Sequence, residues 1–299
     1  MTPTDQIPSD RPSPLRGITS AASLRPAIRR VFFLFGADPE FGERVLDLAD
    51  RLFRGKIWNV EPDALRYHDF AHTIQASYCL LDLIAGHTRD NNPALSPREV
   101  ELALAAVLLH DAGYLKVTGD NEGSGAKYTY SHVLRSCGLA ASLLPTLGCR
   151  LDEIDLVVGG IRCTGISGSP ALISFRSSSS QLIGCMVATA DYLGQMAAPE
   201  YPEKLPFLFH EFAEADVFSN VPPEKRAFTT VEALLAATPG FWTKFVRPKL
   251  DADLQGVHRF LAPPDQPDAN PYFAAIESNI AIIRARTASA IPASATPGT

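Results

Sequence analysis

An apolar segment that ends in two strong metal-ligand residues constrains this chain more than any other stretch. The residues ALAAVLLHDAGY (103–114) carry no polar side chain before His110 and Asp111. Just upstream, SPRE (96–99) has the signals of a helix start: Ser at the N-cap, Pro at the first helical position, and Glu completing a capping box. The sequence therefore predicts a buried helix that presents the His–Asp pair rigidly at its end.

Helical periodicity also dominates the rest of the chain. Apolar residues recur at the spacing of one helix face, and the alternation typical of strands is scarce. We therefore expect an all-α fold. The segments expected to be helical are 24–53 with a break near Gly36–Pro39, then 68–86, 96–111, 131–148, 151–165 and 182–197, with further helices up to residue 284.

The two ends of the chain differ from its middle in composition. Residues 1–22 are rich in Pro, Ser and Thr, and residues 285–299 are of low complexity. We expect both to be disordered, with a single helical domain over 23–284 and a metal-site core at about 60–200. The amino terminus lacks the apolar region of a signal peptide. The sequence contains no run of about 18 apolar residues, so we expect no membrane span.

The cysteines indicate the redox compartment of the protein, and the net charge argues against one class of binding partner. The five cysteines form no CxxC pair and lie mostly in apolar runs, which indicates reduced, buried thiols and a cytoplasmic protein. A net charge of −6 argues against duplex nucleic acid as a partner, because such binding needs Lys and Arg facing the phosphates. A small anionic substrate remains compatible, since a bound metal can supply local positive charge.

Residues elsewhere in the chain extend the His110–Asp111 pair into a metal-ligand set. His68 and His72 are four residues apart, a spacing that places both on one face of a helix. Asp191 lies in an apolar helical segment, where a carboxylate is costly unless it is paired or binds a metal; an N-cap or a salt bridge is the alternative. Imidazole and carboxylate together favour a divalent ion such as Mn, Mg, Zn, Fe or Ni over a thiolate site.

The order of these residues resembles the HD superfamily of metal-dependent phosphohydrolases. Within that superfamily, YHDFAHT (67–73) is similar to the YHNxxHA motif of cyclic-nucleotide phosphodiesterases. LSPREVELALAAVLLHDAGY (95–114) is similar to the helix that delivers the HD pair in the same family. The resemblance covers roughly residues 60–200. It implies an HD-domain helical bundle, here with extra C-terminal helices.

The resemblance implies roles residue by residue. His68 would be the general acid that protonates the leaving oxygen. The residues in metal-ligand positions are His72, His110, Asp111 and Asp191.

Further positions are implied less directly. His132 stands where many HD proteins offer a ligand to a second metal, and Glu122 is a candidate for positioning water. Asp69 replaces the family's Asn, and with Gln195 it is a candidate for substrate binding. Dinuclear relatives supply more histidines where this chain has Cys163 and Thr164, and the HDxxHPG continuation reads HDAGYLK here. One metal site is therefore expected, with a second left open.

These features predict hydrolysis of a phosphoester, with a cyclic nucleotide favoured, by metal-activated water and His68 as general acid. Three alternatives stay open: a phosphomonoesterase acting on nucleotides, a sensor that binds a nucleotide without turnover, and an HD-type diiron oxygenase. The oxygenase needs further histidines between the HD pair and Asp191, where His132 alone occurs. Residues 199–273 carry no motif from which the substrate can be read.

Overall fold

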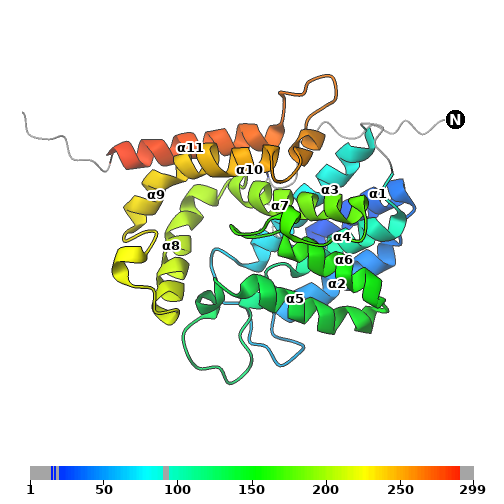
Figure 1. Cartoon of the computed structure of the whole chain (residues 1–299), viewed down its shortest axis with the longest axis horizontal. Helices are drawn as coiled ribbons and strands as arrows, with labels where there is room; N and C mark the ends of the chain where they lie inside the picture. Colours follow the sequence, from blue (N-terminus) through cyan, green and yellow to red (C-terminus); the bar gives the residue numbers. More distant parts are fainter. Residues whose placement is uncertain (1–14, 16, 18–19, 90–93, 290–299) are drawn as a thin grey trace, which may run out of the picture.

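The computed structural model describes residues 15, 17, 20–89 and 94–289, and helices make up most of it (Figure 1). Among these residues there is no strand, and one isolated antiparallel bridge joins Val60 to Val117. The predicted all-α fold is therefore confirmed. None of the described helices is long and apolar enough to span a membrane.

The connections between the α-helices range from the short segment 36–38 between α1 and α2 to the long segment 110–131 between α4 and α5, and several contain one or two 3-10 turns. Their bounds are α1 Ala21–Phe35, α2 Pro39–Phe53, α3 Phe70–Arg89, α4 Pro97–Leu109, α5 His132–Leu143, α6 Leu151–Arg162, α7 Ser178–Met196, α8 Tyr201–Phe218, α9 Val231–Gly240, α10 Arg247–Asp251 and α11 Pro271–Ser289. A π-helical turn, Phe241–Val246, connects α9 to α10.

Local signals account for the helix ends that were predicted best. α1 ends at Gly36, which has the left-handed φ of 65° that glycine adopts readily, and Asp38 caps α2 ahead of Pro39. α4 begins with the expected capping box. The Ser96 hydroxyl accepts the Glu99 N–H at 3.3 Å, and the Glu99 carboxylate accepts the Ser96 N–H at 2.8 Å.

α3 begins later than the sequence indicated. The helix was expected from residue 68, but it starts at Phe70, and His68 lies in the bend before it. The Asp69 carboxylate accepts the backbone N–H of His72 at 2.9 Å, which is the hydrogen bond of an N-cap side chain. The prediction that His68 and His72 share one helix face is therefore wrong, because Asp69 caps the helix between them.

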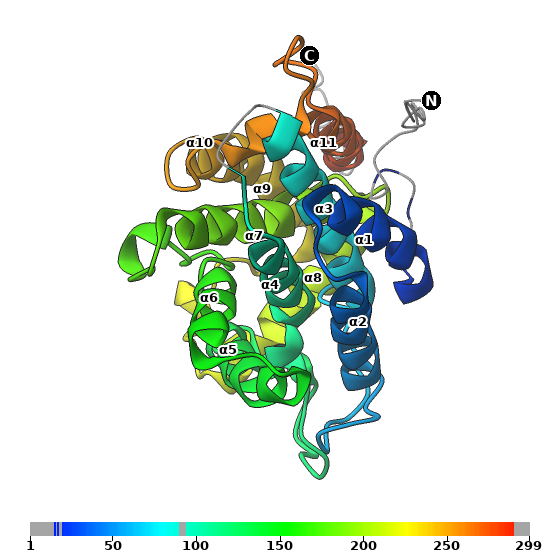
Figure 2. The same ribbon diagram turned by 90° about the vertical axis from the view of Figure 1, so that its right-hand side faces the viewer.

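α3, α4 and α7 form the centre of the fold. In Figure 2, α4 lies between α2 and α6, and it contacts both of them as well as α3 and α7. α7 meets α3 at Gly194, where a Cβ atom would lie 2.8 Å from the backbone of Ala76. Glycine thus permits the close approach of the two helices, and all three central helices have mostly buried residues.

The C-terminal helices pack on this centre. α11 runs beside α9 in Figure 1 and also contacts α7 and α8. α1 begins at Ala21 and α11 continues to Ser289, so the helical domain reaches slightly into both terminal segments that were expected to be disordered. Apart from residues 15, 17 and 20, the remainder of those segments lies outside the described residues.

The five cysteines, Cys79, Cys137, Cys149, Cys163 and Cys185, are free and buried, as predicted.

Candidate metal centre

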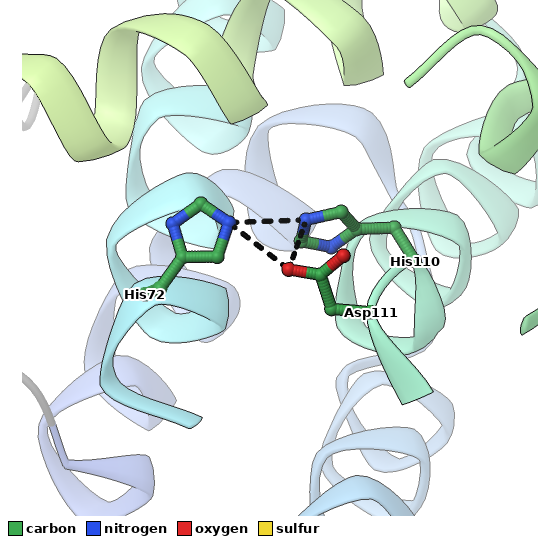
Figure 3. A group of neighbouring side chains, drawn as sticks. All are labelled: His72, His110 and Asp111. Carbon is green, nitrogen blue, oxygen red and sulfur yellow. Dashed lines mark hydrogen bonds and ion pairs between the residues drawn. The ribbon is translucent and has the colours of Figure 1, made fainter. Parts of the chain in front are cut away.

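Three separate helices bring the proposed ligands together. His72 lies in the first turn of α3, His110 and Asp111 directly follow α4, and Asp191 lies in α7. Figure 3 shows the His72 imidazole facing His110 and Asp111 across the space between α3 and α4. All four side chains are largely shielded from solvent. His72, His110 and Asp111 form a group that could hold a metal ion.

The spacing of His72, His110 and Asp111 suits a common ligand, and Asp191 lies close to both imidazoles. His72 Nε2 lies 3.2 Å from His110 Nε2, 3.3 Å from Asp111 Oδ2 and 3.1 Å from Asp191 Oδ1. His110 Nε2 lies 3.3 Å and 3.5 Å from the same two oxygens. Donor atoms bound at about 2.1 Å to one ion stand about 3.0–3.4 Å apart in octahedral or tetrahedral arrangements. Four of the five observed separations lie in that range, and the separation of His110 Nε2 from Asp191 Oδ1, 3.5 Å, slightly exceeds it.

The hydrogen bonds around this group leave unpaired acceptor atoms on His110 and Asp111, and these atoms face each other. His110 Nδ1 lies 2.7 Å from the Val107 carbonyl oxygen, so Nδ1 carries the proton that is donated and Nε2 is left with a lone pair. Asp111 Oδ2 is buried and accepts no hydrogen bond within the described structure. Nitrogen and carboxylate lone pairs at such short range require a proton or a cation between them.

The pKa shifts in the metal-free group also indicate that its carboxylates need a compensating proton or cation. Burial opposes a charge on His72 and His110, but the carboxylates of Asp111 and Asp191 outweigh it and raise the pKa of both imidazoles. Burial likewise opposes ionisation of the two carboxyls, and the imidazoles nevertheless hold the pKa of each well below its ordinary value. A divalent cation would replace the protons that otherwise compensate these carboxylates.

A tight turn after α4 brings His132 to the edge of the group. Asp111 has φ −103° and ψ 5°, near the sparsely populated bridge region, and Gly113 follows two residues later. A Cβ at Gly113 would lie 2.0 Å from the His132 carbonyl oxygen, so glycine lets the start of α5 approach this turn. His132 Nε2 consequently lies 3.6 Å from Asp111 Oδ1. Its Nδ1 lies 2.7 Å from the Thr129 carbonyl oxygen, to which it donates.

The pKa of His132 is shifted in the opposite direction from those of His72 and His110. Burial, which is the largest influence, lowers the pKa of His132 even though Asp111 acts in the opposite direction. The imidazole is therefore neutral near pH 7, with the Nε2 lone pair available at the edge of the group. This is the position from which the predicted second ligand or a substrate contact would act.

His68 is held beside the group by a residue that sequence reasoning missed. His68 Nδ1 lies 2.6 Å from Glu211 Oε2, and Glu211 Oε1 accepts the backbone N–H groups of Tyr67 and Arg66 at 2.9 and 3.3 Å. Burial works against ionisation of Glu211, yet His68 and the two N–H groups keep the pKa of its carboxyl below the ordinary value. No local signal distinguishes Glu211, within FLFHEF (207–212), from the other acidic residues of α8.

Aromatic stacking completes the position of His68. Its ring stacks on Tyr114 at a centroid distance of 4.6 Å, and Tyr114 stacks on His132 at 4.4 Å. The centroids of His68 and His72 are 6.1 Å apart. His68 therefore adjoins the metal-ligand group even though it is not part of α3.

Asp69 and Gln195, the candidates for substrate binding, are engaged in holding ligand residues in place. Asp69 caps α3 and pairs with Lys204 at 2.8 Å. Gln195 donates to Asp191 Oδ1 at 3.0 Å and accepts the Tyr67 hydroxyl at 2.6 Å. Their role in substrate binding stays a prediction.

Glu122, the candidate for positioning water, is exposed on the loop after the HD pair. Its backbone carbonyl accepts from Lys127, and its backbone N–H donates to Asp120. No contact between its side chain and the His–Asp group is present in the described part of the chain.

Comparison of the sequence with protein-family models yields no matching family, and no curated protein matches it. The chemistry of the chain is therefore inferred from its own residues.

Proposed function

We propose that this chain is a metal-dependent phosphohydrolase of the HD type, with a phosphodiester of a nucleotide, cyclic in the first instance, as its substrate. The observation that carries the proposal is the buried group of His72, His110 and Asp111, with Asp191 beside both imidazoles. Their order along the chain is that of the HD superfamily, which the sequence resembles. When bound there, a divalent ion supplies a Lewis acid that lowers the pKa of a bound water to about 7 and offsets charge on the phosphoryl group.

His68 is suited to move a proton at the edge of this site. Its Nδ1 is committed to Glu211 at 2.6 Å, which fixes the ring and leaves Nε2 to act on the substrate. As general acid, His68 would donate its Nε2–H to the departing alkoxide oxygen. Tyr114, stacked on the ring, restricts its rotation. The dyad thus supplies a positioned acid next to, but separate from, the metal ligands.

His132 also stacks on Tyr114, and its ring centroid lies 6.3 Å from that of His68. As a neutral imidazole with its Nδ1–H donated to Thr129, it presents an acceptor nitrogen. That nitrogen would either orient a nucleophilic water or bind a second ion shared through Asp111, to which it is adjacent.

The proposal is tested by separating metal binding from turnover. The wild-type protein and the variants His68→Asn and His72→Ala are loaded with Mn²⁺ and assayed on cyclic AMP, cyclic GMP, a linear dinucleotide and nucleoside monophosphates. His68→Asn should keep its Mn²⁺ content and lose about 10²–10⁴-fold in turnover, the range for removal of a general acid. His72→Ala should lose the metal. His210→Asn, an exposed histidine on α8, is the matched control and should change neither quantity.

Each other outcome has a defined meaning. Loss of metal from His68→Asn with retention in His72→Ala would refute the assignment of roles. Hydrolysis confined to the monophosphates would indicate a phosphomonoesterase. Tight binding of one nucleotide with no product from any would indicate a sensor, and metal-dependent oxygen consumption would indicate the oxygenase.

A further inference from the structure

One nitrogen of the His72 imidazole is buried without a partner. Nε2 faces the other ligands, whereas Nδ1 is on the side of the ring away from His110 and Asp111 (Figure 3). Within the described residues, Nδ1 makes no hydrogen bond. A metal-binding histidine almost always donates its second N–H to a carboxylate, a carbonyl or a water, which fixes the tautomer. His110 does so through the Val107 carbonyl, but His72 has no such group among the residues that the structure describes.

A cavity of about 10 Å³ adjoins His72. This volume holds one water molecule, provided that two to four polar partners surround it. The residues that line the cavity together with His72 are Tyr67, Gln75, Gln195, Ala198, Tyr201 and Lys204. Several of these side chains carry polar groups, which can serve as hydrogen-bond partners for a water, although most of the surface lining the cavity is apolar.

The hydrogen-bonding capacity around the cavity matches one water. Gln75 uses its amide nitrogen on Glu200, which leaves its carbonyl oxygen as an acceptor. The Gln195 carbonyl oxygen accepts the Tyr67 hydroxyl and retains a second lone pair.

Tyr201 supplies the donor that a water at this place would need. It is the first residue of α8 and is buried, and its hydroxyl has no hydrogen bond to another described residue. Burial raises the pKa of Tyr201 far above the physiological range, so the hydroxyl keeps its proton. A water here can accept from Tyr201 and from His72 Nδ1–H, and it can donate to the two glutamine carbonyls.

We propose that one ordered water occupies this cavity, and that Tyr201 acts through it as a positioning residue for His72. The water would accept the Nδ1–H of His72, which leaves Nε2 deprotonated and directed at the metal. The start of α8 would thereby contribute to metal affinity without a residue of its own in the ligand set. This inference rests on the metal centre of the proposed function.

The variant Tyr201→Phe tests the proposal because it removes the hydroxyl and keeps the ring. The dissociation constant for Zn²⁺ should rise about 10–100-fold, as is typical when a partner of a ligand histidine is lost. Tyr78→Phe is the matched control: this buried tyrosine lies on α3 like His72, but its hydroxyl donates to the Ser23 carbonyl. It should leave Zn²⁺ affinity unchanged. Circular dichroism of each variant checks that the helical fold is retained.

A crystal structure of the wild-type protein supplies an independent readout. It should show a water within hydrogen-bond distance of both His72 Nδ1 and the Tyr201 hydroxyl. Unchanged Zn²⁺ affinity in Tyr201→Phe, or an empty cavity, would overturn the inference while leaving the metal centre intact. Failure of the wild-type protein to bind any divalent ion would instead contradict the metal centre itself.

Discussion

The two ends of α4 carry buried charges that are compensated in different ways. At its amino-terminal end, Arg98 donates to the two carboxylate oxygens of Glu153 at 2.9 and 3.1 Å and to Glu101 at 2.8 Å. Arg150 adds a contact to Glu153 at 3.0 Å. Both carboxylates are buried, and each faces a guanidinium group that always carries its charge. This cluster is complete within the protein.

At the carboxy-terminal end of α4, the buried carboxylate of Asp111 faces imidazoles instead. Its Oδ2 lies 3.3 Å from Nε2 of both His72 and His110, and it accepts no hydrogen bond in the described structure. An imidazole, unlike arginine, has a lone pair on this nitrogen whenever it is neutral. The comparison teaches that the partner decides the role: the carboxylates beside Arg98 face a fixed positive charge, whereas Asp111, between two imidazoles, needs a proton or a cation.

Among the substitutions that test this comparison, replacing Asp111 should have the largest effect on stability in the presence of metal. Wild-type protein should gain about 2.7 kcal/mol in free energy of unfolding when Mn²⁺ is present at 100 times its dissociation constant. Asp111→Asn should show almost none of this gain, because the amide is a much poorer metal ligand. Urea unfolding with and without Mn²⁺ measures it. Glu153→Gln is the control and should keep the full gain, although its stability without metal is lower. An equal gain in Asp111→Asn would contradict the metal centre.

Replacing Arg98 should have a smaller effect that does not depend on metal. Arg98→Leu should lower the free energy of unfolding at pH 7 by about 2 kcal/mol, since Glu153 loses a charged hydrogen-bond partner. The hydrogen bonds from Arg98 lower the pKa of Glu153 in the folded protein. Their contribution is therefore full above the unfolded pKa, about 4.3, and is lost as the pH falls through the folded pKa. Urea unfolding at pH 7, 4.5 and 3 should show the two proteins converging in acid.

The matched control for Arg98 is an exposed ion pair. Arg54 pairs with Asp50 one turn earlier on the surface of α2. Arg54→Leu should cost less than about 0.5 kcal/mol, because solvent screens such pairs. A difference between wild type and Arg98→Leu that stays constant with pH, or a cost no larger than that of Arg54→Leu, would contradict the account of the arginine cluster.

The elements that local sequence could predict are those whose signals lie within a few residues. The capping box at Ser96 and Glu99 sets the start of α4, and the following apolar run sets its burial, so the position of the His–Asp pair was predictable. The start of α3 was misplaced because Asp69 fits a helical pattern as well as a cap. Its carboxylate is held in the cap position by Lys204, which lies 135 residues away in the chain.

The contacts that orient the site were not predictable for the same reason. Glu211 reaches His68 across 143 residues, and Gln195 reaches Tyr67 across 128. Nothing in the local pattern of α8 distinguishes Glu211 from the other acidic residues of that helix. Residue type and order therefore sufficed to predict which residues form the buried His–Asp group, whereas the groups that orient the site depended on how α7 and α8 pack near the loop before α3.

The most direct test of the central claim is anomalous diffraction from crystals grown with Zn²⁺. The account predicts one anomalous peak at about 2.0–2.2 Å from His72 Nε2, His110 Nε2, Asp111 Oδ2 and Asp191 Oδ1. A second, weaker peak between Asp111 Oδ1 and His132 Nε2 would extend the centre to two ions. No peak among these four atoms, or occupancy at another site with this one lacking metal, would contradict the claim that they form a metal centre.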